Sequence, residues 1–370
     1  MKKNVGKNQS YCREINFELV INLLRQKPHS ATQLADILQL SNATMSSIVK
    51  DLLDMKMIVV SESLSIKGSG RKQVFYELNS KFGLILVVNI AHRSADISVT
   101  NIKEECIASE TMAISDINEV EVQKVILKAT QLLFTCQNEA TLKNIIISMT
   151  GLVKDETETS EKHFVQAAFE KQFHGVPTYL TNDGNLISYG ELSKGVFSKE
   201  KNGIMMLVDY GIGGSFVINQ ELFRGDNGFA GEMGNQLCEE NGTLQYLEDV
   251  ASLRVLMNKA EAVVNRKVKM EDLFELYRSN KEVHDIVLKS AEAVAKALRS
   301  MTTVLDIRNV VISGRVMEFG EEYLNIIKKE VSINNEKTVV QFSPLGYQGP
   351  MIGGAYIGVD YILKKSLEKK

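Results

Sequence analysis

Apolar positions at the start of the chain follow the 3.6-residue period of short helices. The first helix is predicted over residues 11–27. A second follows Ser30, which has capping-box spacing to Gln33, and a third follows Ser41 as its N-cap. On the third, apolar residues repeat along one face: Met45, Ile48, Val49, Leu52 and Leu53. This succession predicts a helix-turn-helix unit.

The opposite face of the third helix carries short polar side chains and a lysine: Asn42, Thr44, Ser46, Ser47 and Lys50. Such groups can bond to base edges and phosphates in a DNA major groove. Residues 57–79 alternate like a β-hairpin, with Lys67, Arg71 and Lys72 around a Gly-Ser-Gly tip, which is typical of a wing that contacts the DNA backbone or minor groove. We therefore predict a DNA-binding winged helix-turn-helix domain over residues 1–78. The alternative is a small helical interaction domain whose polar face is solvated.

Beyond Asn79 the pattern alternates between strands and helices, which predicts an α/β fold. The expected strands include residues 142–153, 176–185 and 309–314, and the expected helices include 119–134, 246–262, 270–278 and 281–305. One strand delivers Asn182 and Asp183 at its carboxyl end, where α/β folds hold ligands. An Asp followed by Gly is also a common turn or N-cap, so this position alone leaves both interpretations open.

A second candidate for ligand binding is "GFAGEMGN", residues 228–235. Gly231 and Gly234 flank Glu232, so the backbone can approach a ligand that the carboxylate contacts. Carboxylates and amides can each hold two vicinal hydroxyls of a sugar. Together with Asn182 and Asp183, this loop favours a small-molecule pocket.

Composition narrows the class of protein. The four cysteines are scattered and never form a Cys-x-x-Cys pair, which argues against a disulfide framework and against a cysteine-rich zinc site. No apolar run approaches the roughly 18–20 residues of a membrane span, and the N-terminus has no secretory signal pattern. We expect a cytoplasmic protein without membrane contact. Residues 1–78 are basic, with 11 Lys and Arg against 7 Asp and Glu, although the net charge of the chain is −3.

The segments "VDYGIGGSFVINQELFRGDNGFAGEMGN", "TNDGN" and the glycine-rich C-terminus resemble the ROK family of repressors, open reading frames and kinases. The resemblance is to the branch in which a winged helix precedes a sugar-kinase-like body. It implies an actin-like, ribonuclease-H-like fold of two α/β subdomains around a cleft. We expect the first subdomain over residues 79–190, with a C-terminal helix (350–370) returning to it. The second is expected over residues 191–349, with a helical dimerisation region.

Family kinases bind hexose through an Asn-Asp pair, the Glu and His of a Gly-Glu-x-Gly-His motif, and a later Glu; the Asp is the base. The resemblance therefore implies a sugar site in this chain, with Asn235 in place of the histidine. Its residues are Asn182, Asp183, Gly231, Glu232, Asn235 and Glu248.

The resemblance breaks at the turn that accepts ATP phosphates in family kinases. A phosphate cradle needs crowded backbone N–H groups without side chains, yet Asn89 stands at the aspartate position, and Ala91, His92 and Arg93 fill the turn. Without this turn phosphoryl transfer fails, so Asp183 is expected to accept a hydroxyl without acting as a base. We expect a solvated turn here, and contact of His92 and Arg93 with another anion is the alternative.

Two further differences concern metal and the sugar clamp. Asn235 and Cys238 replace a zinc-binding set of one His and three Cys, and one thiol cannot hold a structural zinc. The segment 151–177 is short and acidic where relatives close over the sugar. No metal and no cofactor are expected.

These observations predict a transcriptional regulator, specifically a repressor of carbohydrate-utilisation genes, and not an enzyme. A homodimer, able to pair into a tetramer, would place its heads on double-stranded operator DNA. A sugar or sugar derivative in the cleft would change the spacing of the heads, because coupling needs differential affinity for two states and not turnover. The alternatives are an active sugar kinase with a DNA-binding head and an effector-free regulator with a decayed pocket.

Overall fold

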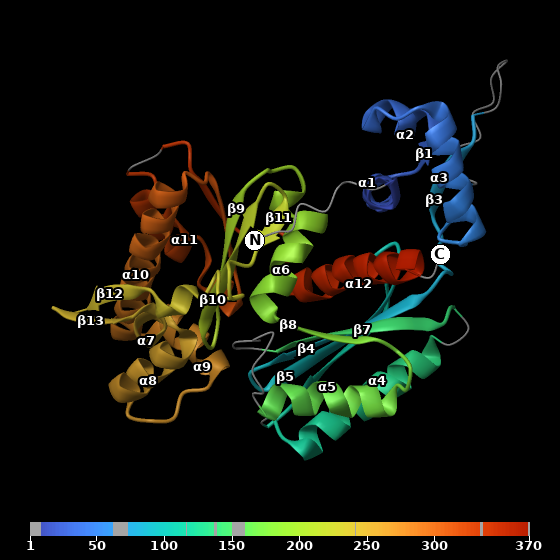
Figure 1. Ribbon diagram of the computed structural model, residues 1–370. Coiled ribbons are helices and arrows are strands. Elements are labelled where there is room, and N and C mark those ends of the chain that lie inside the picture. The colour runs from blue at the N-terminus through green and yellow to red at the C-terminus, as the bar shows by residue number, and fades with distance from the viewer. Residues whose placement is uncertain are drawn as a thin grey trace.

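The computed structural model describes the chain over residues 9–61, 73–115, 117–136, 139–149, 160–240, 242–333 and 336–368. A small helical head lies beside two larger α/β subdomains, and the C-terminal helix α12 lies between the head and the sheet that contains β4 and β7 (Figure 1). None of the helices in these ranges is long and apolar enough to cross a membrane.

The head is a winged helix. Its elements are α1 (Gln9–Gln26), β1 (His29–Ser30), α2 (Ala31–Leu38), α3 (Asn42–Asp54), β2 (Ile58–Val60) and β3 (Phe75–Leu78), with an antiparallel sheet in the order β1-β3-β2. The capping box of Ser30 and Gln33 is confirmed, and so is Ser41 as the N-cap of α3. The predicted wing tip, with Lys67, Arg71 and Lys72, lies outside the described residues.

The first α/β subdomain contains the predicted segment with Asn182 and Asp183. Its elements are β4 (Leu84–Ala91), β5 (Ser94–Asn101), β6 (Cys106–Ala113), α4 (Glu119–Thr135), β7 (Leu142–Met149), α5 (Ser160–Gln172), β8 (Thr178–Asn182) and α6 (Asp183–Ser193). The sheet order is β6-β5-β4-β7-β8, antiparallel up to β4 and parallel beyond it. Helices α4 and α5 cover one face, and α6 and α12 (Gly349–Glu368) cover the other (Figure 1).

The second α/β subdomain repeats this topology. Its sheet runs β11-β10-β9-β14-β15, again with an antiparallel hairpin side and a parallel side. The strands are β9 (Gly203–Val208), β10 (Ile212–Ile218), β11 (Glu221–Phe223), β14 (Asn309–Ser313) and β15 (Val339–Phe342). The repeat is the actin-like, ribonuclease-H-like arrangement that the resemblance implies. The subdomain boundaries after residues 78, 190 and 349 stay predictions.

Helices pack on this second sheet. They are α7 (Leu247–Ala251), α8 (Leu253–Val264), α9 (Met270–Ser279), α10 (Lys281–Leu305) and α11 (Gly320–Val331); a ribbon of β12 (Leu237–Glu240) and β13 (Thr243–Tyr246) precedes them. Short 3₁₀ turns lie at η2 (Val196–Ser198), η3 (Met233–Asn235), η4 (Arg315–Phe319) and η5 (Gly346–Gln348). The single helix expected over 246–262 is wrong: it breaks at Ser252, where the backbone is extended and the N–H of Leu253 bonds to the carbonyl of Asp209.

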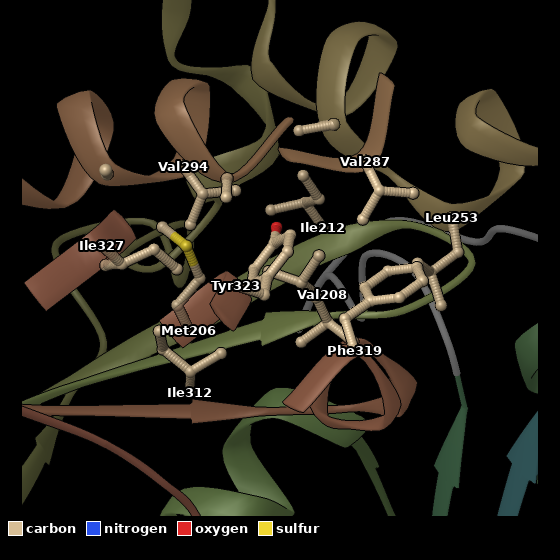
Figure 2. Close-up of a cluster of buried hydrophobic side chains, with 14 of the residues drawn as sticks. Met206, Val208, Ile212, Leu253, Val287, Val294, Ile312, Phe319, Tyr323 and Ile327 are labelled. Atoms are coloured by element: carbon tan, nitrogen blue, oxygen red, sulfur yellow. The ribbon is translucent and has the colours of Figure 1, made fainter. Parts of the chain in front are cut away.

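The largest apolar core lies between this sheet and its helices. Tyr323 of α11 is fully buried among strand residues such as Met206 and Ile312 and helix residues such as Val294 (Figure 2). Burial of this area removes apolar surface from water, and that is the main favourable contribution to folding. The core therefore holds the sheet and its helices together and so positions the loops at the strand ends.

Candidate functional site

The segment with the Asn-Asp pair begins α6 at the carboxyl end of β8. Asn182 is the N-cap, and its Oδ1 accepts the N–H of Asn185 at 2.7 Å. Asp183 follows as the first helical residue, and its Oδ1 accepts the N–H of Gly184 at 2.9 Å. Both side chains are half-buried. The structure thus combines the two interpretations left open by the sequence: the pair caps a helix and also sits where α/β folds hold ligands.

Three glycines bring the other predicted loop to this helix. A Cβ on Gly184 would lie 3.3 Å from the carbonyl oxygen of Gly214, and a Cβ on Gly231 would lie 2.4 Å from the same oxygen. Gly231 also has φ +99°, which favours glycine. The backbones of Gly184 and Gly231 therefore both pack against Gly214. Asp183 precedes Gly184 and Glu232 follows Gly231, so these two carboxylate residues lie in the same region. Gly231 was expected to let the backbone approach a ligand, whereas here it allows approach of backbone to backbone.

Glu248, at the start of α7, lies next to these glycines. Its Oε2 accepts the N–H of Ile212 at 3.1 Å, and a Cβ on Gly234 would lie 3.1 Å from it. Its Oε1 is 3.8 Å from Nη2 of Arg254. Asn235 follows Gly234 and is exposed. One carboxylate oxygen of Glu248 thus holds the β9–β10 hairpin, a framework contact that the sequence does not predict.

The turn that the resemblance aligns with the phosphate loop of family kinases packs against a second turn. His92 lies in the turn between β4 and β5, and Tyr210 lies in the turn between β9 and β10. Their rings stack with centroids 3.4 Å apart and planes 14° from parallel. The ring of His92 thus packs against the second α/β subdomain, whereas Arg93 in the same turn is exposed, as expected for a solvated turn. Sequence reading missed this contact, since nothing local links the two turns.

Polar side chains next to these two turns are bonded within the chain. Asn89 accepts the hydroxyl of Ser148 at 2.6 Å, and its amide lies 3.5 Å from a carboxylate oxygen of Asp96. Asp209 accepts the N–H of Arg315 at 2.8 Å and also its Nε at 3.1 Å. A phosphate cradle needs free backbone N–H groups and room for the anion. In the β9–β10 turn the N–H of Tyr210 bonds to Oδ1 of Asp209 at 2.8 Å and the N–H of Ile212 bonds to Oε2 of Glu248 at 3.1 Å, so two backbone donors already have partners within the chain.

The metal prediction stays a prediction. Cys238 lies on β12, where burial first and the charge of Glu240 second raise the pKa of its thiol. A metal ligand must be the thiolate, so this environment is unfavourable for coordination. Within the described ranges no group of three or more His, Cys, Asp and Glu side chains has an arrangement that could hold a metal ion.

The predicted DNA-reading face of α3 is exposed along its length: Asn42, Thr44, Ser46, Ser47 and Lys50 all face solvent. Thr44 also takes part in the N-cap, because its N–H and its hydroxyl lie 3.1 and 2.8 Å from Oγ of Ser41. Ser46, Ser47 and Lys50 are therefore the clearer candidates for contacts with bases and phosphates.

Comparison with known proteins fits this architecture. The chain matches the ROK family over residues 86–358. The chain belongs to the ROK family. The xylose repressor of Staphylococcus xylosus is 24% identical over 328 residues, which is 84% of this chain and 85% of that protein. The xylose repressor of Bacillus subtilis is 24% identical and covers 96% of this chain and 98% of its own. The N-acetylmannosamine kinase of Haemophilus influenzae is 29% identical over 51% of this chain and 65% of its own.

Solved structures divide in the same way. A ROK family transcriptional regulator, described as a homologue of the E. coli MLC protein, has a TM-score of 0.80 at 18% identity and covers 97% of this chain and 100% of its own. A ROK glucokinase from Streptomyces griseus, solved with glucose and AMPPNP, has a TM-score of 0.62 at 20% identity and covers 74% of this chain and 99% of its own. This ROK chain therefore has a sugar-kinase-like body preceded by a winged helix-turn-helix head.

Proposed function

We propose that this ROK chain is a DNA-binding transcriptional repressor that senses a sugar and transfers no phosphate. The observation that carries the proposal is the stack of His92 on Tyr210, reinforced by the pair of Asp209 with Arg315, in the place of a nucleotide cradle. Phosphoryl transfer depends on positioning and charge stabilisation of the phosphates, and we infer that these turns supply neither. The named xylose repressors that match along most of the chain support the same function, and D-xylose is the first sugar to test.

The proposed sugar site lies between the start of α6 and the loop around η3. In it Asp183 and Glu232 accept sugar hydroxyls, Asn182 donates through its amide, and Gly231 keeps the loop close to α6. Asn235, at the exposed edge, contacts the sugar in the place of the family's histidine. Glu248 keeps one oxygen for the hairpin and offers the other to a hydroxyl.

The proposed assembly is a homodimer on a two-fold symmetric operator in the cytoplasm, since two heads read two half-sites. An apolar groove of about 560 Å³ on the second α/β subdomain supports a contact there between two copies of this chain. It is lined by Phe216, Ile218, Phe223, Met301, Val304 and Leu305, and the side chain of Val304 is 82% exposed. Exposed apolar surface of this kind marks interaction sites.

Calorimetric titration of D-xylose tests the sugar site. We expect Asp183→Ala and Glu232→Ala each to raise the Kd for D-xylose about ten- to a hundredfold, because each removes a charged hydrogen-bond partner of a hydroxyl. Asp226→Ala, an exposed carboxylate of the same stretch, is the matched control and should leave the Kd unchanged. Equal Kd values for all variants would place the sugar elsewhere.

A DNA fragment that the protein selects from a random-sequence pool tests the repressor function. D-xylose should lower the affinity of the wild type for this fragment and should leave binding to unselected DNA little changed. A coupled assay with ATP and D-xylose should show no turnover. Phosphorylation of the sugar that Asp183→Ala abolishes would establish a kinase and refute the sensor.

A further inference from the structure

Arg25, at the end of α1, ties the head to the body. Its side chain is 7% exposed, and its Nη2 donates to Oδ1 of Asp360 at 2.6 Å and to the carbonyl of Tyr356 at 3.1 Å, both on α12. The guanidinium also lies over the ring of Tyr356, 4.1 Å from its centroid. On another side, its Nε is 3.4 Å from Oε1 of Glu104. One cation of the head thus meets two separate elements of the body.

Glu104 connects this cation to α6. It lies in the turn between β5 and β6 with φ +60°, and its side chain is 2% exposed. Its Oε2 accepts the hydroxyl of Ser193, and its carbonyl accepts Nζ of Lys194 at 3.0 Å, both at the C-terminal end of α6. The adjacent Lys103 pairs with Glu77 of the head at 3.1 Å. The turn is therefore held by the head on one side and by α6 on the other.

Helix α6 reaches from the proposed sugar site to this turn. It has 11 residues and so spans roughly 16 Å, with Asn182 and Asp183 at one end and Ser193 at the other. It is also in backbone contact with α12, because a Cβ on Gly353 would lie 1.7 Å from the carbonyl oxygen of Leu186. Close-packed helices transmit displacement and do not absorb it. A shift at Asp183 therefore reaches both elements that hold Arg25.

The cluster around Arg25 is not fully satisfied. Nε and Nη1 of Arg25 and Oε1 of Glu104 are buried and have no hydrogen-bond partner, although the ions are near each other. A buried network with unmade bonds is unfavourable, so a small rotation that completes the Arg25–Glu104 bonds would recover part of the free energy lost with the bonds to α12. Two arrangements of the guanidinium are the requirement for a switch.

We propose that Arg25 is a positioning residue that sets the orientation of the head according to the place where α6 holds Glu104. The inference rests on the proposed function, because a ligand in the cleft is what moves α6. Arg25 lies neither in the proposed sugar site nor on the exposed face of α3, and its proposed role is to pass the displacement of α6 to α1. Only a difference in affinity between the two arrangements is needed for a sugar to shift their populations.

The first test uses no sugar. In the full chain, hydrogen exchange of α1 is measured for Ser193→Ala, for Arg25→Lys, which keeps the charge and loses the planar fork, and for the double variant. Because both residues contact Glu104, we expect non-additive effects on exchange of about threefold or more. Ser198→Ala is the matched control: its hydroxyl bonds to the carbonyl of Gly195 at 2.7 Å, and its effect should add to that of Arg25→Lys. Additive effects for Ser193→Ala as well would overturn the relay.

The second test adds D-xylose and the selected DNA fragment. Glu104→Gln keeps an acceptor for Ser193 and removes the charge that faces Arg25. We expect it to bind D-xylose and DNA as the wild type does, yet to lose at least about fivefold of the effect of D-xylose on DNA affinity. If Glu104 only stabilised the fold, its replacement would change folding or the DNA affinity itself. It would not leave both affinities intact while reducing the effect of D-xylose on DNA binding. Full release of DNA by D-xylose in Glu104→Gln and Arg25→Lys would contradict the proposal. If the wild type binds no D-xylose, the sugar assignment fails, and the exchange test still decides the relay.

Discussion

Replacing Gly353 with alanine tests the contact between α6 and α12 most directly. A Cβ at this position would lie 1.7 Å from the carbonyl oxygen of Leu186 and 2.8 Å from the nitrogen of Gly190, both backbone atoms of α6. A side-chain neighbour could rotate away, but a helix backbone cannot. Alanine at 353 therefore forces the two helices apart. Gly349 lies in the same helix, and a Cβ there would meet the side chain of Ile187 at 3.5 Å, an ordinary contact.

The two substitutions should differ in sign. Overpacking costs about 1–3 kcal/mol in typical cores, and a clash with rigid backbone belongs at the upper end, so we expect Gly353→Ala to lower the free energy of unfolding by about 3 kcal/mol or more. Gly349→Ala removes conformational freedom from the unfolded chain and should leave stability unchanged or raise it by about 0.4–1 kcal/mol. The separation of α6 from α12 should also displace Asp183 and weaken D-xylose binding in Gly353→Ala.

Urea unfolding followed by circular dichroism measures both variants, and calorimetry measures their binding of D-xylose. The reasoning is refuted if Gly353→Ala unfolds within about 0.5 kcal/mol of the wild type, a range typical of harmless surface changes. It is also refuted if Gly349→Ala is destabilised by a similar amount, because the loss would then follow from changing a helical glycine and not from the backbone contact.

Further predictions concern the buried Glu191, the stack of His92 on Tyr210, and the head. Burial raises the pKa of Glu191 above 4.5, although hydrogen bonds oppose this shift. The stability of the wild type relative to Glu191→Gln should therefore be greatest below about pH 4.5 and should fall as the pH rises through the raised pKa. Thermal unfolding of both proteins from pH 4 to 8 measures this difference, and a difference that does not change with pH would contradict the prediction. A double-mutant cycle of His92→Ala and Tyr210→Ala should give a coupling of about 0.5–1.5 kcal/mol in urea unfolding, and zero coupling would show that the stack is not stabilising. Ser47→Ala should reduce preference for the selected DNA over random DNA by about 1–3 kcal/mol, whereas Lys50→Ala should weaken both and flatten the salt slope by about one; the reverse pattern would exchange their roles.

Local contacts of the head were predictable from the sequence. Ser30, Gln33 and Ser41 bond to backbone groups within three residues, so spacing alone identifies them. The contact of Arg25 with Asp360 joins positions 335 apart, and the surrounding sequence of either residue looks like an ordinary helix face. Periodicity reports which face of a helix is apolar, but it does not report which distant element covers that face.

The glycines show why part of the site could be predicted and its workings could not. Gly231 was recognisable because a position that excludes a Cβ is visible in one sequence as glycine. The atom that excludes the Cβ is not visible there, and a ligand was expected in that place. The structure gives it to another backbone at Gly231 and again at Gly353, where α12 meets α6. The same absence of side chains thus assembles the proposed sugar site and couples its helix to α12, so a substitution at either glycine should disturb sugar binding and head orientation together.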